Sequence, residues 1–131
     1  MRLDTSLKVL YVDDSVVIRD MLESSLMRIG FMNIEGAVDG IDALEKCAEE
    51  EYDFIIADIN MPNMDGITMI KELRQKFDYM STPIMVLTTE WSSEMKKKGR
   101  EAGATSWVVK PFDTDLLERA ITETLAKVNE I

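Results

Sequence analysis

The chain alternates short apolar runs with longer stretches of helical periodicity, and this alternation restricts the folds that it can adopt. There are five such apolar runs. One of them, Ile34–Val38, is less continuously apolar than the other four because Glu35 and Gly36 interrupt it, as is typical of an edge strand. Five strand–helix repeats predict an α/β fold in which helices cover both faces of a parallel sheet. The other four runs have the length and composition of fully buried strands: Val9–Val12, Phe54–Ala57, Ile84–Leu87 and Trp107–Val109.

The stretches between these runs carry the start and stop signals of helices. Ser15 can cap the first helix, and Asp65-Gly66 precede the third. A charged stretch over 92–102 is closed by Gly103. The apolar faces expected from helical spacing are Ile18, Met21, Leu22, Leu26 and Ile29; Ile41, Leu44, Cys47 and Ala48; Ile67, Ile70, Leu73 and Phe77; and Leu116, Leu117, Ala120, Ile121, Leu125 and Val128.

Composition restricts the function as well. The formal net charge of −10 argues against non-specific nucleic-acid binding, which needs a basic surface. The absence of histidine argues against a zinc site and against a serine–histidine triad. No apolar run approaches the ~18 residues of a membrane span, and a single cysteine, Cys47, fits a reducing cytosol. We expect a cytoplasmic protein with one domain over 1–131, a core over about 7–128 and no output domain.

Five polar residues follow or end these runs on the carboxyl side, where open parallel sheets bind ligands. They are Asp13, Asp14, Asp58, Thr88 and Lys110. Three carboxylates at one sheet edge repel one another, so a hard divalent cation is expected among them, and oxygen ligands suit Mg²⁺. A carboxylate beside Mg²⁺, a lysine and a hydroxyl suits phosphoryl transfer. Asp58 is the best candidate nucleophile because it stands alone after its run.

Four segments, in this order, resemble the receiver domain of two-component response regulators. They are Val12–Ser15, Asp58–Gly66, Leu87–Glu90 and Val109–Phe112. The segment Lys97–Phe112 is especially similar to the stand-alone, CheY-like chemotaxis regulators of this family. The resemblance covers essentially the whole chain. It implies a doubly wound, flavodoxin-like (βα)5 sheet with strand order 2-1-3-4-5.

The resemblance also implies roles for the polar residues. Asp58 would accept a phosphoryl group from a sensor histidine kinase of the CheA-like type. Asp14 and Asp58 would ligate Mg²⁺ together with the backbone carbonyl of Asn60, and Asp13 would act mainly through water. Lys110 would bridge to the phosphoryl group.

Further implied roles concern switching and the lifetime of the phosphorylated state. Thr88 would turn inward on phosphorylation and the aromatic residue Trp107 would follow it. The Lys110-Pro111 bond is expected to be cis, and Asn60 and Glu90 occupy positions that tune hydrolysis. Two residues depart from the family pattern: Trp107 replaces the usual Tyr or Phe, and Ile59 replaces the Trp of well-known chemotaxis regulators.

The implied partners include a flagellar motor switch protein of the FliM-like type and a phosphatase, but no nucleic acid and no membrane. The motor protein would contact a surface that includes Trp91, Lys96–Lys98, Trp107 and Lys127. We expect a monomer that is not an enzyme, although it would promote its own phosphorylation and dephosphorylation.

Two other functions remain possible interpretations of the sequence. In one, the chain is a single-domain phosphorelay carrier that passes its phosphoryl group to a histidine on another protein. In the other, it is a Mg²⁺-dependent phosphohydrolase with an aspartate nucleophile. Such enzymes usually carry a second acidic residue two positions after the nucleophile, where this chain has Asn60. A purely structural module would leave the carboxylate cluster unexplained.

Overall fold

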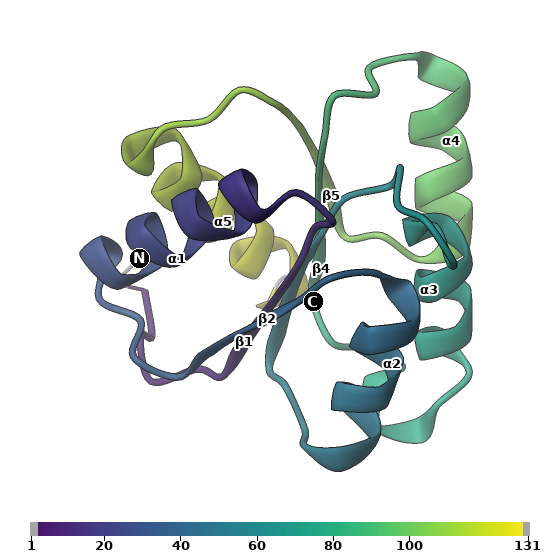
Figure 1. Ribbon diagram of the computed structural model, residues 1–131, viewed down its shortest axis with the longest axis horizontal. Coiled ribbons are helices and arrows are strands. Elements are labelled where there is room, and N and C mark those ends of the chain that lie inside the picture. Colours follow the sequence, from purple (N-terminus) through teal and green to yellow (C-terminus); the bar gives the residue numbers. More distant parts are fainter. Residues whose placement is uncertain (1–2, 130–131) are drawn as a thin grey trace.

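The computed structural model describes residues 3–129, which form one parallel sheet with helices on both faces (Figure 1). None of the helices in this range is long and apolar enough to cross a membrane. In chain order the elements are β1 (Val9–Val12), α1 (Val16–Ile29), β2 (Ile34–Ala37), α2 (Gly40–Glu49), β3 (Phe54–Ala57), α3 (Gly66–Arg74), the 3-10 turn η1 (Phe77–Tyr79), β4 (Ile84–Thr88), α4 (Ser93–Ala102), β5 (Ser106–Val109) and α5 (Thr114–Asn129).

The five strands lie in the order β2-β1-β3-β4-β5, and every neighbouring pair is parallel. This confirms the predicted order and places the interrupted run, now β2, at an edge of the sheet. The chain runs outward from β1 to β2 and then returns to β3 on the other side of β1. The switch point between β1 and β3 is where open sheets of this kind bind ligands, beyond the carboxyl ends of the strands.

The strands are apolar throughout because both faces of the sheet are buried. Along β1, Val9 and Tyr11 pack into the core under α1 and α5, whereas Leu10 and Val12 pack into the core under α2, α3 and α4. Figure 1 shows these two groups of helices on opposite sides of the sheet. A half-buried strand would alternate apolar and polar residues, so the continuous runs correctly indicated two covered faces.

The predicted helix starts are confirmed by side-chain caps. Ser15 Oγ accepts a hydrogen bond from the Ile18 amide at 3.3 Å, and Asp65 Oδ1 accepts one from the Thr68 amide at 2.9 Å. Gly103 ends α4, as its position in the sequence predicted. These caps satisfy amides that have no partner within the helix.

The predicted apolar faces of the helices are correct near the sheet and wrong at their margins. Met21, Ile41 and Val128 are 42%, 43% and 40% exposed, and Ala48 is also exposed. Phe77 is 88% exposed because α3 ends at Arg74 and Phe77 belongs to the following turn. Helical spacing identifies the side of a helix that turns inward, but neighbouring elements decide how wide a stripe they cover.

Arg74 explains why α3 stops where it does. Its guanidinium donates to the carbonyl oxygens of Tyr79 and Thr82, each at 2.7 Å, and to that of Gly103 at 2.7 and 3.0 Å. These bonds hold the turn before β4 and the end of α4 against the end of α3. These hydrogen bonds from one partly buried cation stabilise the turn that follows Arg74. The helical pattern of residues 67–77 did not predict this turn.

Cys47 is a packing residue, as its position in an apolar pattern predicted. It is 7% exposed and lies in the core under α2, α3 and α4. Burial raises the pKa of its thiol, which disfavours the reactive thiolate.

The adjacent residues Leu26 and Met27 of α1 form a matched test of the packing. Leu26 is 0% exposed and Met27 is 56% exposed. Leu26→Ala should lower the free energy of unfolding by about 2–5 kcal/mol because it leaves a cavity. Met27→Ala should change it by less than about 0.5 kcal/mol. Urea unfolding followed by circular dichroism measures both changes, and equal losses would contradict the buried face assigned to α1.

Candidate functional site

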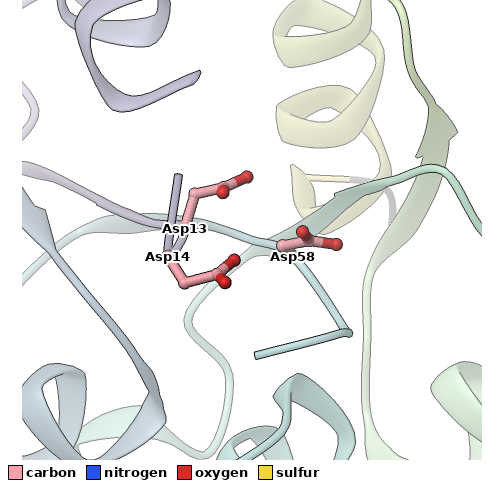
Figure 2. Close-up of side chains that lie close together, drawn as sticks. All are labelled: Asp13, Asp14 and Asp58. Atoms are coloured by element: carbon pink, nitrogen blue, oxygen red, sulfur yellow. The ribbon is translucent and has the colours of Figure 1, made fainter. Parts of the chain in front are cut away.

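Three carboxylates meet at the carboxyl edge of the sheet. One oxygen each from Asp13, Asp14 and Asp58 lies within 4.8 Å of the others, and Figure 2 shows the three side chains gathered beside the ends of β1 and β3. Backbone bonds beyond the strands position them: the Asp13 amide donates to Ala37 O at 3.1 Å and the Asp58 amide to Val12 O at 3.0 Å. The predicted convergence of the three carboxylates is confirmed.

Lys110 enters this cluster from the end of β5. Its Nζ lies 2.7 Å from Asp13 Oδ2 and 3.2 Å from Asp58 Oδ2, and its amide donates to Thr88 O at 2.8 Å. Burial lowers the pKa of Lys110, but its bonds and charge interactions with Asp13 and Asp58 outweigh this effect, so the net pKa lies above its usual value. The ammonium therefore stays charged, and one positive charge faces three carboxylates.

The charge imbalance makes this donor set suitable for Mg²⁺. Asp14 is exposed, whereas Asp13 and Asp58 are 2% and 8% exposed, so the cluster opens to solvent on the side of Asp14. Carboxylate oxygens are the ligands that Mg²⁺ prefers, and the cluster has negative charge left over after pairing with Lys110. A bound Mg²⁺ would supply charge compensation for the carboxylates and for the oxygens of an incoming phosphoryl group.

Asp58 is held by its own backbone as well as by Lys110. One carboxylate oxygen, Oδ1, accepts the Ile59 amide at 2.7 Å, and the other, Oδ2, accepts from Lys110. Asp13 is fixed in a similar way, because its Oδ1 accepts the Ser15 amide at 2.9 Å. Both buried carboxylates are thus oriented before any ligand arrives.

The loop after Asp58 passes close to the site. The Gly66 amide donates to Ile59 O at 2.9 Å, and a methyl group at residue 66 would overlap the carbonyl oxygen of Asp58. Glycine at this position therefore allows the start of α3 to pack against the backbone of the phosphoacceptor candidate.

A second contact, which sequence reasoning missed, holds the same loop to the start of α2. Asn63 Nδ2 donates to Asp39 Oδ2 at 2.7 Å, and Asn63 has a positive φ of 68°. Asp39 also caps α2 through the Asp42 amide at 2.8 Å. These hydrogen bonds lower the pKa of Asp39 below its usual value. The available sequence signal was the cap pattern of Asp39 before a helix, but no local pattern pairs it with Asn63.

The remaining predicted residues meet around Glu90, in the loop between β4 and α4. The Glu90 amide donates to Thr88 Oγ1 at 3.3 Å, and Trp107 Nε1 donates to Glu90 O at 2.9 Å. Asn60 Nδ2 donates to Glu90 Oε1 at 3.1 Å. Thr88 is 0% exposed, and the Lys110-Pro111 peptide bond is cis. The loop thus connects Asn60, two positions after Asp58, with Trp107 of β5.

A search against models of known families matches residues 9–122 to the response regulator receiver domain. The chain belongs to this family. The chemotaxis protein CheY-3 of Vibrio cholerae is 32% identical to this receiver domain over 119 residues, which cover 91% of this chain and 92% of CheY-3. Receiver domains bind Mg²⁺ at an acidic pocket, and the cluster of Asp13, Asp14 and Asp58 forms such a pocket here.

Solved structures agree with the assignment. The chemotaxis response regulator CheY4 of Vibrio cholerae is 43% identical, with a TM-score of 0.86 over 91% of this chain and 98% of CheY4. The CheX–CheY–BeF3–Mg complex of Borrelia burgdorferi contains a chain that is 29% identical, with a TM-score of 0.84 over 91% of this chain and 89% of that one. This receiver domain is therefore of the CheY type, whose members are signalling regulators and not classical enzymes.

The charge imbalance predicts that Asp14→Asn stabilises the protein in the absence of Mg²⁺ and reduces the stabilisation that Mg²⁺ provides. Without the metal, the substitution should raise the melting temperature because it removes repulsion among the carboxylates. With Mg²⁺ at about ten times its dissociation constant, the wild type should gain about 1.4 kcal/mol, whereas the variant should gain much less. Differential scanning calorimetry over a Mg²⁺ titration measures both effects.

Asp20→Asn is the matched control, because Asp20 is an exposed carboxylate of α1 outside the cluster. It should keep the response of the wild type to Mg²⁺. An undiminished Mg²⁺ response in Asp14→Asn would show that the ion binds elsewhere.

Proposed function

We propose that this receiver domain accepts a phosphoryl group on Asp58 from a sensor histidine kinase in a reaction that needs Mg²⁺. The observation that carries the proposal is the placement of the Asp58 carboxylate 3.2 Å from Lys110 Nζ and within the acidic cluster. A carboxylate oxygen of Asp58 attacks the phosphorus of a phosphohistidine. The P–N bond breaks, its electron pair returns to the imidazole, and an aspartyl phosphate forms.

The neighbours of Asp58 suit this reaction. Asp14, Asp58 and the Asn60 backbone carbonyl would hold Mg²⁺, with Asp13 acting mainly through water. Lys110, already held beside Asp58, would bond to a phosphoryl oxygen and help to balance its charge. The buried Thr88 hydroxyl would turn toward the phosphoryl group, and Trp107 would respond to that movement.

Asn60 and Glu90 would tune how long the phosphoryl group persists. Both lie at the solvent side of the site, where their 3.1 Å hydrogen bond spans the gap between the loops after β3 and β4. A water molecule that attacks the phosphorus has to approach past such residues. The identity of residue 60 argues against the phosphohydrolase alternative, because Asn60 provides an amide where those enzymes provide an acid.

The phosphorylated domain would signal through the surface formed by α4, β5 and α5, for which we keep the name α4–β5–α5 surface. A pocket of about 270 Å³ on this surface is lined by Trp107 and by the cationic side chains of Lys96, Arg100 and Lys127. This local positive charge stands out on a chain with a net charge of −10. Together with Trp91, which is 74% exposed, it suits an acidic and partly apolar partner segment.

We infer that this partner is a flagellar motor switch protein and that the receiver domain acts as a cytoplasmic monomer. The relative CheY-3 supports the role in chemotaxis, because it is a chemotaxis protein and the alignment covers 92% of its length. The structure of a Borrelia relative with CheX, BeF3 and Mg²⁺ supports a further protein partner for the phosphorylated state, such as a phosphatase. A phosphorelay carrier would share the same site but would use a histidine protein as its partner.

Intact-protein mass spectrometry after brief incubation with acetyl phosphate tests the phosphoacceptor. The wild type should gain one phosphoryl group when Mg²⁺ is present and none when it is chelated. Asp58→Asn should gain none, whereas Asp78→Asn, which alters an exposed carboxylate of η1, should behave as the wild type. Phosphorylation of Asp58→Asn would disprove the site. A wild type that takes up neither a phosphoryl group nor beryllofluoride would disprove the function.

Lys110→Ala separates phosphorylation from its consequence. The variant should still be phosphorylated on Asp58, but its affinity for an acidic peptide from a motor switch protein should not rise, because no cation connects the phosphoryl group to β5. Lys71→Ala, an exposed lysine of α3, serves as the control. Fluorescence anisotropy of the labelled peptide measures the affinity. A normal rise in Lys110→Ala would contradict the assigned role.

The same peptide separates the two remaining functions. A motor regulator should bind it more tightly after phosphorylation. A phosphorelay carrier should instead lose its phosphoryl group to a histidine phosphotransfer protein and should leave the peptide unbound.

A further inference from the structure

Gly99 is buried within α4, although glycine is a poor helix former. It faces the indole of Trp107 on β5. A methyl group at residue 99 would overlap Cζ3 of the indole and would lie 2.8 Å from Cε3, which is closer than van der Waals contact allows. The missing side chain therefore leaves a space in α4 that the benzene half of the indole fills.

The opposite edge of the indole is held by a hydrogen bond. Trp107 Nε1 donates to Glu90 O at 2.9 Å, and the ring packs against the core under α2, α3 and α4. The Glu90 carboxylate in turn accepts from Asn60, two residues after Asp58. The position of the indole therefore determines whether β5 is bonded to a loop that also contacts the phosphoacceptor segment.

We propose that Gly99 is a positioning residue for Trp107. By admitting the indole into α4, it places Nε1 on the Glu90 carbonyl and holds the ring at the wall of the pocket that Lys96, Arg100 and Lys127 also line, so that the ring does not fill this pocket. The packing part of this inference is independent of the proposed function. Its consequence for partner binding rests on that function.

Helix propensity and packing predict opposite effects of Gly99→Ala on stability. Propensity alone would lower the unfolding equilibrium constant about fourfold, because alanine is the better helix former. Overlap with the indole should instead raise it roughly fivefold or more. The sign of the change therefore decides between an incidental glycine and one that makes room for Trp107.

A double-mutant cycle in urea tests whether the two residues act together. In a Trp107→Phe background the smaller ring leaves room for the methyl group, so Gly99→Ala should no longer destabilise the protein. Restored stability in the double variant supports the proposal. A stabilising effect of Gly99→Ala in the wild-type background, or equal effects in both backgrounds, would overturn it.

Fluorescence tests the position of the ring directly. Trp91→Phe removes the exposed indole and leaves Trp107 as the single reporter. In this background Gly99→Ala should shift the emission of Trp107 to longer wavelength and should increase its quenching by iodide, because the displaced ring contacts water. Loss of stability with unchanged emission would mean that α4 moves instead of the ring, and would overturn the positioning role.

Partner binding tests the consequence for signalling. Gly99→Ala should take up a phosphoryl group from acetyl phosphate as the wild type does, because Gly99 lies outside the carboxylate cluster. Its affinity for the acidic motor-switch peptide should fall roughly fivefold or more, since the displaced ring fills the cationic pocket. Wild-type affinity would overturn this consequence. A wild type that takes up no phosphoryl group would instead refute the proposed function. The double-mutant cycle would still decide whether Gly99 makes room for Trp107.

Discussion

The hydrogen bonds of the Lys110 ammonium to Asp13 and Asp58 are the interaction on which the functional edge of the molecule depends. They join the ends of β1, β3 and β5 with one partly buried cation. Removing charges from water is costly unless they are paired, and here one ammonium compensates three carboxylates incompletely. The site therefore carries an excess of negative charge, which a divalent cation can balance. A cluster that was already neutral without a metal would be more stable but would not attract a divalent cation.

The loop between β4 and α4 is where this edge meets the rest of the surface. Glu90 bonds through its amide to Thr88, through its carbonyl to Trp107 and through its carboxylate to Asn60. One residue of an exposed loop thus touches a buried strand end, an aromatic ring and the segment after Asp58. In the proposed function, a charge added at Asp58 would act on Trp107 and β5 through this loop.

Much of this organisation could be predicted from the sequence, for physical reasons that differ among the parts. The strands were predicted within one residue because burial on both faces leaves continuous apolar runs that stop at polar residues. The helix faces were predicted less well. Met21 and Ile41 have the right spacing but lie beyond the edge of the covering elements, and Phe77 falls after a stop imposed by Arg74.

The sequence by itself determined the strands and the set of polar residues at the carboxyl edge of the sheet, because strand burial and strand ends are recorded in local residue types. The order of the strands was implied by the resemblance to receiver domains and not by local residue types. Only the tertiary structure decided which distant groups meet. The pairs Asp39–Asn63, Arg74–Gly103 and Gly99–Trp107 join different loops, helices and strands. Their partners are set by the distances between packed elements, and no local periodicity encodes those distances.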